Sequence, residues 1–152
     1  MEKKLKITAI VQARLKSSRL PNKVLEKINS KTIIEIINER LKVSKLINNI
    51  ILSIPKTDFK LIKFFKKKKI KYSAGSENNV LKRFYQCAKK DKSDLVIRVT
   101  ADCPLVDAEI IDKMIISFKS YENLDLLTNY FPPTFPDGLD IAIFNFKTLE
   151  YT

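Results

Sequence analysis

The stretch ITAIVQARLKSSRLPNK, residues 7–23, decides the fold. Its first part, Ile7–Gln12, is a short apolar run with several β-branched side chains, which predicts a buried strand. The polar and basic segment Ala13–Lys23 follows at once. In proteins of alternating strands and helices, ligands bind beyond the carboxyl ends of parallel strands. The residues directly after each strand therefore carry most of the functional information.

The rest of the chain alternates short β-rich runs with longer amphipathic segments. Further strands are expected at residues 49–54, 70–73, 95–99, 124–127 and 139–144, and helices at 32–44, 58–68, 77–90 and 108–118. This alternation predicts an α/β fold, a three-layer α/β/α sandwich around a mostly parallel sheet. No repeat or linker divides residues 1–152, so we expect a single domain. A helical segment begins near Phe146 and stops within two turns, so the sheet is expected to lack its final elements.

Composition excludes several classes of protein. No apolar run is long enough for a membrane-spanning helix, and the run behind the basic N-terminus is too short for a signal peptide, so a cytoplasmic protein is expected. Cys87 and Cys103 have no metal-binding spacing, and the chain has no histidine, so reduced thiols are expected. The net charge of +12 comes mainly from scattered lysines, and the dense run Lys66–Lys69 falls at an expected helix end. A solvated surface is therefore favoured over nucleic-acid binding.

The loop Ala13–Lys23 is the first candidate ligand site. It holds four basic side chains and two hydroxyls, namely Arg14, Lys16, Ser17, Ser18, Arg19 and Lys23. Arginine binds phosphate oxygens as a bidentate fork and lysine as a point charge, so the loop suits a triphosphate. The alternative is an ordinary polar loop. The loop contains no glycine, which excludes the Walker A and GxGxxG phosphate-binding motifs.

A carboxylate follows the strand expected at residues 95–99. Asp102 precedes a proline, and helix capping does not account for it, so it is the candidate ligand for a metal carried by a nucleotide. Mg²⁺ prefers oxygen and often takes only one or two protein carboxylates in addition to phosphates and water. Asp107 is instead expected to cap the helix that begins at Ala108.

The chain has two glycines, and both lie in candidate functional segments. Gly75, in the segment Ala74–Ser76, favours either a positive φ or a close approach of another group, while Ser76 either contacts a ligand or caps the next helix. Gly138 lies in Asp137–Asp140, which is either a plain turn into a strand or a pair of carboxylates that contact a sugar or a metal.

Four segments, Ile10–Lys23, Ala74–Tyr85, Val99–Leu105 and Phe135–Asp140, follow one another along the chain. In this order they resemble the motifs of the cytidylyltransferase family. That family includes acylneuraminate and 3-deoxy-manno-octulosonate cytidylyltransferases, and the match is best with its spore-coat polysaccharide biosynthesis protein F branch. The resemblance covers nearly the whole chain in register.

The resemblance implies a nucleotide-diphospho-sugar transferase fold and an activity. CMP would pass from CTP to a sugar or sugar acid, with release of pyrophosphate, in surface polysaccharide biosynthesis. It also implies roles for residues. The phosphates would be bound by Arg14, Ser17, Arg19 and Lys23, of which Arg14 and Lys23 would also be catalytic. The cytosine would lie near Ala13, Ala74, Gly75 and Ser76, Asp102 would bind Mg²⁺, and Asp137 and Asp140 would bind the acceptor. A homodimer through residues 130–135 is a further expectation. With no histidine, catalysis would rest on positioning and charge neutralisation.

The chain departs from the family pattern in ways that leave alternatives open. Glycines are usual where this chain has Lys16, Asn22 and Ala101. Asparagine tolerates the left-handed region, whereas Lys16 either adds charge to the phosphate site or crowds it, and Ala101 restricts the turn before Asp102. Family members are usually longer, so the chain is expected to be the nucleotide-binding portion of a longer domain. The alternative function is a non-catalytic nucleotide-binding module. A nucleic-acid-binding protein comes third, on net charge alone.

Overall fold

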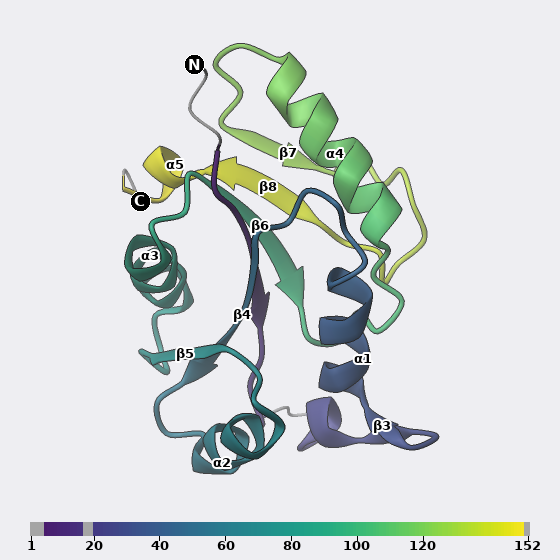
Figure 1. Cartoon of the computed structure of the whole chain (residues 1–152), viewed down its shortest axis with the longest axis vertical. Coiled ribbons are helices and arrows are strands. Elements are labelled where there is room, and N and C mark those ends of the chain that lie inside the picture. The colour runs from purple at the N-terminus through teal and green to yellow at the C-terminus, as the bar shows by residue number, and fades with distance from the viewer. Residues whose placement is uncertain (1–4, 17–19, 151–152) are drawn as a thin grey trace.

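The computed structural model describes residues 5–16 and 20–150. A six-stranded sheet with the strand order β5-β4-β1-β6-β8-β7 lies at the centre of the fold (Figure 1). The strands are β1 (Ile7–Gln12), β4 (Asn49–Pro55), β5 (Tyr72–Gly75), β6 (Leu95–Thr100), β7 (Leu126–Thr128) and β8 (Ala142–Asn145). The first four in space, β5, β4, β1 and β6, are parallel, and β8 runs antiparallel to both β6 and β7. The predicted, mostly parallel sheet is confirmed.

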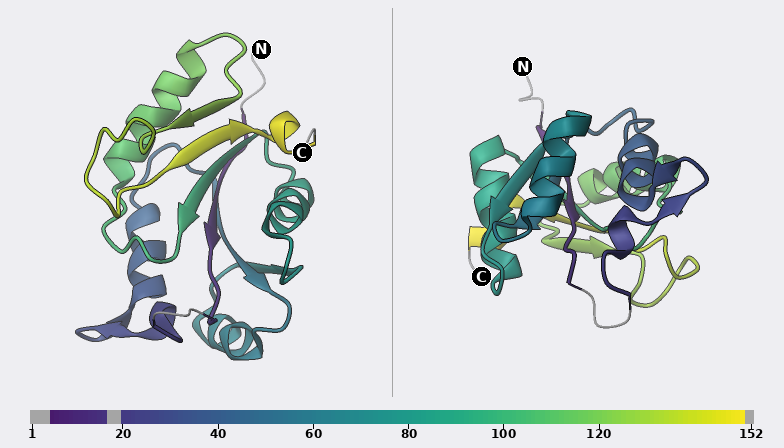
Figure 2. Two further views of the ribbon diagram at one scale, coloured as in Figure 1. Left: turned by 180° about the vertical axis from the view of Figure 1, so that it is seen from behind. Right: turned by 90° about the horizontal axis from the view of Figure 1, so that it is seen from below.

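Helices cover both faces of the sheet (Figures 1 and 2). They are α1 (Ile33–Leu41), α2 (Phe59–Lys68), α3 (Val80–Asp91), α4 (Ala108–Ser120) and α5 (Phe146–Glu150). Buried side chains of α1, α2 and α4 share one core with Ala9 and Val11, whereas α3 and α5 share a second core with Ile10. Alternate residues of β1 thus enter opposite cores, as the side-chain period of a strand requires. The three-layer α/β/α arrangement is confirmed.

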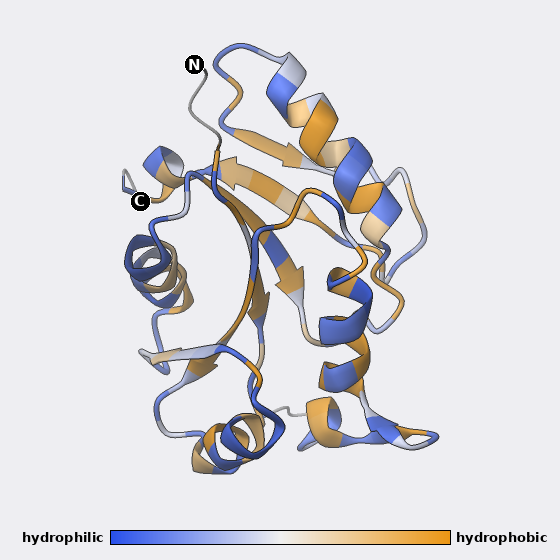
Figure 3. Cartoon of the chain, in the orientation of Figure 1, coloured by the Kyte–Doolittle hydropathy of each residue, from blue (hydrophilic) through white to orange (hydrophobic). Residues whose placement is uncertain are grey.

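Hydropathy along the elements explains these layers. Figure 3 shows largely hydrophobic central strands and helices that carry both hydrophobic and hydrophilic stripes. A strand covered on both faces is apolar throughout, whereas a helix that covers a sheet needs only one apolar side. Among the described residues, no helix is long and apolar enough to cross a membrane.

Two predicted helix starts are confirmed. Thr32 and Glu35 form a capping box, in which the Thr32 hydroxyl accepts from the Glu35 backbone and the Glu35 carboxylate accepts from the Thr32 N–H. The Asp107 carboxylate accepts from two backbone N–H groups in the first turn of α4. Such caps each contribute on the order of 1 kcal/mol to stability.

The boundary between β5 and α3 differs from the prediction. The strand extends to Gly75, and α3 begins at Val80. Asn79 caps the helix by accepting from the Lys82 N–H at 2.7 Å, while the Ser76 hydroxyl accepts from the Asn79 N–H. The interpretation of Ser76 as the cap is therefore wrong, because Asn79 lies closer to the first turn and is an equally good cap.

A short hairpin follows the first loop and was not predicted. A 3₁₀ turn, η1 (Lys23–Leu25), leads into β2 (Lys27–Ile28) and β3 (Lys31–Thr32), which pair antiparallel. Asn22 precedes the turn with φ of 60°, in the left-handed region expected for this asparagine. Strands of two residues carry no periodicity from which the hairpin could have been inferred.

Candidate nucleotide-binding site

The carboxyl ends of the parallel strands bring the predicted segments together. Beyond the last pair of β1 and β4, the Ala13 N–H donates to the Ser53 carbonyl at 3.1 Å. Next to it, the Ala101 N–H donates to the Gln12 carbonyl at 2.9 Å. These bonds hold the start of the basic loop directly beside the turn that contains Asp102, although about 90 residues separate the two in sequence. In Figure 1 this edge of the sheet lies in the lower part of the view.

Two basic residues of the first loop lie at this edge. Arg14 is exposed directly after β1, and Lys23 begins η1 with a half-buried side chain. The Lys23 ammonium lies 4.0 Å from the Asp102 carboxylate, and the two side chains are 39% and 60% exposed. Charges this exposed are weakly bound to each other and are free to exchange partners. Ser17 and Arg19 lie outside the described residues, so their assignment stays a prediction.

Asp58 holds the first loop in place, a role that the sequence analysis missed. Its carboxylate is buried, at 7% exposure, and accepts from the Leu15 N–H at 2.9 Å. On the other arm of the loop, the Asn22 N–H donates to the Leu15 carbonyl at 3.0 Å. Asp58 stands at the N-cap position of α2, but its side chain accepts no hydrogen bond from that helix. The sequence signal for this role was an acidic residue shortly after an expected strand, but a helix cap was the simpler interpretation of Asp58.

Arg83 is the second functional residue that the sequence analysis missed. Its guanidinium comes from α3, is 1% exposed, and donates to the Ser76 carbonyl at 2.5 Å and to the Ser53 hydroxyl at 3.2 Å. Burial lowers the pKa of Arg83, while the nearby Asp58 carboxylate opposes that change. Arg83 thus ties the end of β5 to β4. The sequence signal for this role was a basic residue, Arg83, among the apolar residues on the inward side of an expected helix.

The position of Gly75 explains why a glycine stands there. A Cβ at this position would lie 3.0 Å from the Arg83 Cγ and 3.4 Å from the Gln86 Oε1. Gly75 does not have a positive φ, whereas Gly138 does, at 93°. Of the two alternatives for Gly75, the close approach of another group is therefore the correct one. The segment Ala74–Ser76 therefore rests on a buried arginine, and Ala74 itself is exposed at the edge of the sheet.

The carboxylates of two predicted segments converge near Cys103. Burial raises the pKa of the Cys103 thiol, and the charges of Asp102 and Asp140 raise it further. Asp140 precedes β8, whose antiparallel pairing with β6 brings it to this edge. Asp137 lies on the exposed turn before it and forms no ion pair with the other described residues. The charge of Asp140 thus acts on the same thiol as that of Asp102, whereas Asp137 lies on the exposed turn.

The donor atoms at this edge fit a magnesium ion that also binds a ligand. Within residues 5–16 and 20–150, no group of three or more His, Cys, Asp or Glu residues is arranged to hold a metal ion by itself. The exposed Asp102 carboxylate offers a hard oxygen ligand. Mg²⁺ commonly uses one or two carboxylates and completes its octahedron with phosphate oxygens and water.

An ion pair crosses the rim of the site. The Lys16 ammonium donates to the Glu77 carboxylate at 2.5 Å, and Glu77 also accepts from the Thr57 hydroxyl at 2.8 Å. The hydrogen bond from Lys16 lowers the pKa of Glu77, and the same bond raises the pKa of Lys16. Lys16, which stands where the family usually has glycine, is thus held toward the β5–α3 connection.

This arrangement defines a class of protein. A parallel sheet whose carboxyl edge gathers a basic loop, a glycine-containing segment and an exposed carboxylate is typical of nucleotide-binding α/β proteins. The cytidylyltransferase family model matches residues 8–131. The chain therefore belongs to the cytidylyltransferase family, and its fold is the nucleotide-diphospho-sugar transferase fold that the resemblance implied.

Individual relatives agree with this assignment. An uncharacterized protein of Methanocaldococcus jannaschii is 37% identical over 148 residues, which cover 96% of this chain and 59% of that protein. The spore coat polysaccharide biosynthesis protein SpsF of Bacillus subtilis is 36% identical over 115 residues, which cover 72% of this chain and 48% of that protein. A cytidylyltransferase structure from Leptospira borgpetersenii has a TM-score of 0.90 at 35% identity, covering 97% of this chain and 63% of that one. The chain thus spans about half to two thirds of these relatives' lengths.

Proposed function

We propose that this chain binds CTP and Mg²⁺ and transfers CMP to a sugar or sugar acid, with pyrophosphate as the second product. The observation that carries the proposal is the approach of Lys23, at the end of the first loop, to Asp102, in the turn after β6; their charged atoms are 4.0 Å apart. One side chain suits a phosphate and the other suits the metal that accompanies phosphates in a nucleotide. Membership of the cytidylyltransferase family supports CTP as that nucleotide.

The roles proposed for the site follow its geometry. Arg14 and Lys23, with Ser17 and Arg19 of the same loop, bind the triphosphate. Ala13 and Ala74–Ser76 bind the cytosine, for which the Arg83 anchor under Ser76 supplies a fixed platform. Asp102 holds Mg²⁺, which when bound offsets negative charge on the phosphates. Asp140, just before β8, and Asp137, on the turn before it, contact the acceptor.

The reaction is a substitution at the α-phosphorus of CTP. A hydroxyl oxygen of the acceptor forms the new bond to the α-phosphorus. The bond from the α-phosphorus to the oxygen that bridges the α- and β-phosphates breaks, pyrophosphate leaves with that oxygen, and the hydroxyl proton passes to solvent. Arg14 and Lys23 stabilise the charge that gathers on the phosphate oxygens and the leaving group. Because positioning and charge carry most of this chemistry, a site without histidine is sufficient.

Other parts of the proposal concern the whole protein. We infer a cytoplasmic enzyme of surface polysaccharide biosynthesis, in line with the name of the Bacillus subtilis relative. We also infer a homodimer that covers Phe131 and Phe135, which are 84% and 42% exposed. The second candidate is a nucleotide-binding module without turnover; the chain as given spans 59% and 48% of the two protein relatives.

A thermal-shift titration with CTP, ATP, GTP and UTP, each with and without Mg²⁺, tests the donor site. CTP with Mg²⁺ at about 100 times its dissociation constant should stabilise the fold by roughly 2.7 kcal/mol. Lys23→Gln should reduce this shift, and Lys27→Gln, which removes an exposed lysine of β2, should not. The absence of any nucleotide-dependent shift would refute the proposal.

Pyrophosphate release separates the two candidates. If CTP binds, release of pyrophosphate with sugar or sugar-acid acceptors supports the transferase, and its absence with every acceptor supports the module. Duplex DNA at moderate salt serves as a control for the basic surface, since binding to it should weaken steeply as salt rises.

A further inference from the structure

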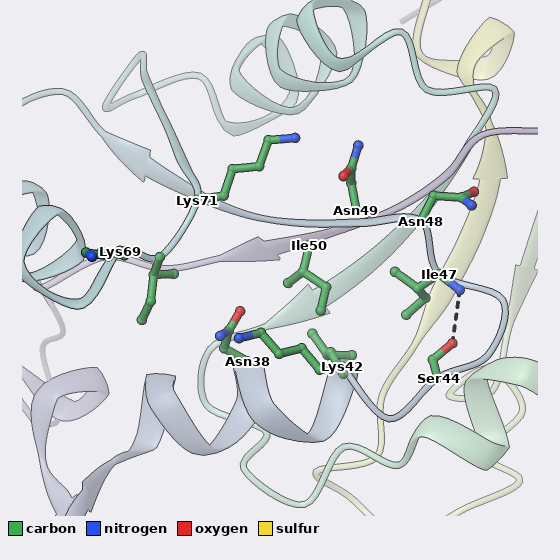
Figure 4. A pocket seen from close by; sticks show the side chains of 11 residues that line it. Asn38, Lys42, Ser44, Ile47, Asn48, Asn49, Ile50, Lys69 and Lys71 are labelled. Atoms are coloured by element: carbon green, nitrogen blue, oxygen red, sulfur yellow. Dashed lines mark hydrogen bonds between the residues drawn. The ribbon is translucent and has the colours of Figure 1, made fainter.

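A second pocket lies at the opposite edge of the sheet from the nucleotide site (Figure 4). It has a volume of about 320 Å³, within the range of small-ligand sites. The end of α1, the start of β4 and the connection from α2 to β5 enclose it. Asn49 and Ile50 begin β4 and line the pocket, whereas Ser53, near the far end of the same strand, contacts the nucleotide site. A ligand here would not compete with a nucleotide.

Asn38 supplies a buried polar group that faces this pocket. The residue is 7% exposed, and Figure 4 shows its side chain rising from α1 toward β4. Its side-chain amide has no hydrogen-bond partner among the described residues. Every fully buried side-chain nitrogen or oxygen atom of the described residues does have a partner, so the amide atoms of Asn38 are not fully buried. The Asn38 amide must therefore open into the pocket. An amide that opens into the pocket and has no partner among the described residues is available to hydrogen-bond a ligand there.

The charge of the pocket selects an anion. Its described lining contains Lys42, Lys69 and Lys71 and no carboxylate. Lys71 already donates to Asp91 at 2.8 Å, which leaves Lys42 and Lys69 without an ion pair to a described residue. Figure 4 shows the Lys42 side chain running along α1 toward Asn38. An ammonium and an amide N–H₂ on the same helix, one turn apart, are suited to a single carboxylate.

The remaining wall of the pocket is apolar. Leu41, Ile47, Ile50 and Ile70 line it, and Leu41 belongs to the buried core. Three other polar residues of the lining have partners: Ser44 donates to Asp112 at 2.5 Å, Asn49 donates to Asp91 at 3.1 Å, and the Asn48 side-chain oxygen accepts from the Ile7 N–H at 2.7 Å. An inorganic anion would leave the isoleucines facing water. A ligand that satisfies both parts of the pocket combines an anionic group with a compact apolar body.

We propose that this pocket binds a small organic carboxylate. Its charged group lies between the Lys42 ammonium and the Asn38 amide, and its apolar body packs against Ile50 and Ile70. The proposal is independent of the proposed function, since it uses other residues at the other edge of the sheet.

Nuclear magnetic resonance of the full chain tests the site with matched probes. In ¹H–¹⁵N spectra, benzoate should cause saturable shifts at the Asn38 side-chain N–H₂ and at the Ile50 and Ile70 amides. A dissociation constant on the order of 10 mM is expected for a probe of this size. Benzamide, which has the same shape without the charge, should bind about fivefold more weakly, the upper range for one part-exposed ion pair. Inorganic phosphate should cause no saturable shift at Ile50 or Ile70.

Two lysine variants complete the test. Lys42→Gln should weaken benzoate binding about fivefold, whereas Lys45→Gln should leave it unchanged, since Lys45 is exposed on the same segment and does not line the pocket. Both positions are exposed, and the same spectra report whether each variant is folded. Equal binding of benzoate and benzamide, unchanged binding to Lys42→Gln, or no saturable shift would overturn the proposal. Addition of CTP to the same samples reports the nucleotide site separately.

Discussion

At the amino edge of the sheet, the Asp91 carboxylate accepts hydrogen bonds from Thr8, Asn49 and Lys71 and is 6% exposed. At the carboxyl edge, the Asp102 carboxylate is 60% exposed and has Lys23 at 4.0 Å. Both are acidic residues near strand ends, but one has a complete set of donors and the other does not. A carboxylate whose lone pairs are filled stabilises the fold, whereas one that faces solvent beside a cation keeps its capacity to bind a ligand. Of the two carboxylates, Asp91 thus stabilises the fold, and Asp102 remains available to a ligand.

The largest expected effect tests the amino edge. Asp91→Ala leaves the buried Thr8 hydroxyl and the Asn49 amide without their acceptor and should lower the free energy of unfolding by about 3 kcal/mol. Urea unfolding measures the change, and Asp125→Ala, at an exposed aspartate, is the control. The dissociation constant for CTP should not change. A large loss of CTP affinity in a folded Asp91→Ala protein would contradict the separation of the two edges.

The acid stability of the protein gives the next effect. Burial alone would raise the pKa of Asp91, but hydrogen bonds from Lys71, Thr8 and Asn49 outweigh it and lower the pKa from 3.8 to about 2. Because the folded-state value is lowered, this stability is complete above pH 3.8 and is lost as the pH falls toward 2. The loss amounts to about 2 kcal/mol. The free energies of unfolding of the wild type and Asp91→Asn, measured against pH, should converge as the pH falls from 3.8 toward 2. A constant difference between them over that range would contradict the assignment to Asp91.

At the carboxyl edge, the expected change is in ligand binding. Asp102→Asn should weaken CTP binding in the presence of Mg²⁺ about tenfold, or ~1.4 kcal/mol, because one metal ligand loses its charge. Binding without Mg²⁺ should be equal or slightly tighter, since a negative charge near the phosphates is removed. Isothermal titration calorimetry measures both, and unfolding should be unaffected because the side chain is exposed. Equal losses with and without the metal would show that Asp102 does not act through Mg²⁺.

The smallest effect concerns the rim. Glu77→Gln removes the charged partner of Lys16, so that Lys16 is free to turn toward the phosphate loop. CTP should bind about twofold more tightly at low salt, and the gain should disappear at high salt. Lys16→Ala in the same background should abolish the gain. If Lys16 crowds the site instead, Glu77→Gln will weaken binding, and the sign of the change therefore decides between the two interpretations of this family departure.

The sequence predicted the layers of the fold but not the contacts that fix the geometry of the candidate site. Strand β1 and the caps at Thr32 and Asp107 follow from local patterns, and the structure confirms them. The roles of Asp58 and Arg83 depend on contacts to residues up to 43 positions away, which no local pattern reveals. Asp58 had a plausible local role as a cap, and Arg83 lay within a helix whose inward side was expected to be apolar.

The boundary at β5 was missed for a related reason. The apolar run ends at Tyr72, yet the strand continues to Gly75 because Ser73, Ala74 and Gly75 pair with residues of β4. Pairing with an already formed neighbour extends a strand beyond the residues that would favour it alone. The segment proposed to bind cytosine is therefore part of the sheet and not a free loop.

The contact between Gly75 and Arg83 has a consequence for the evolution of this chain. A methyl group at position 75 would meet the arginine stem at 3.0 Å, so the two positions constrain each other. Alanine at position 75 would require the Arg83 stem to move by a few tenths of an ångström, and that stem carries the guanidinium that donates to the Ser76 carbonyl. A substitution at either position is therefore expected to favour a compensating change at the other.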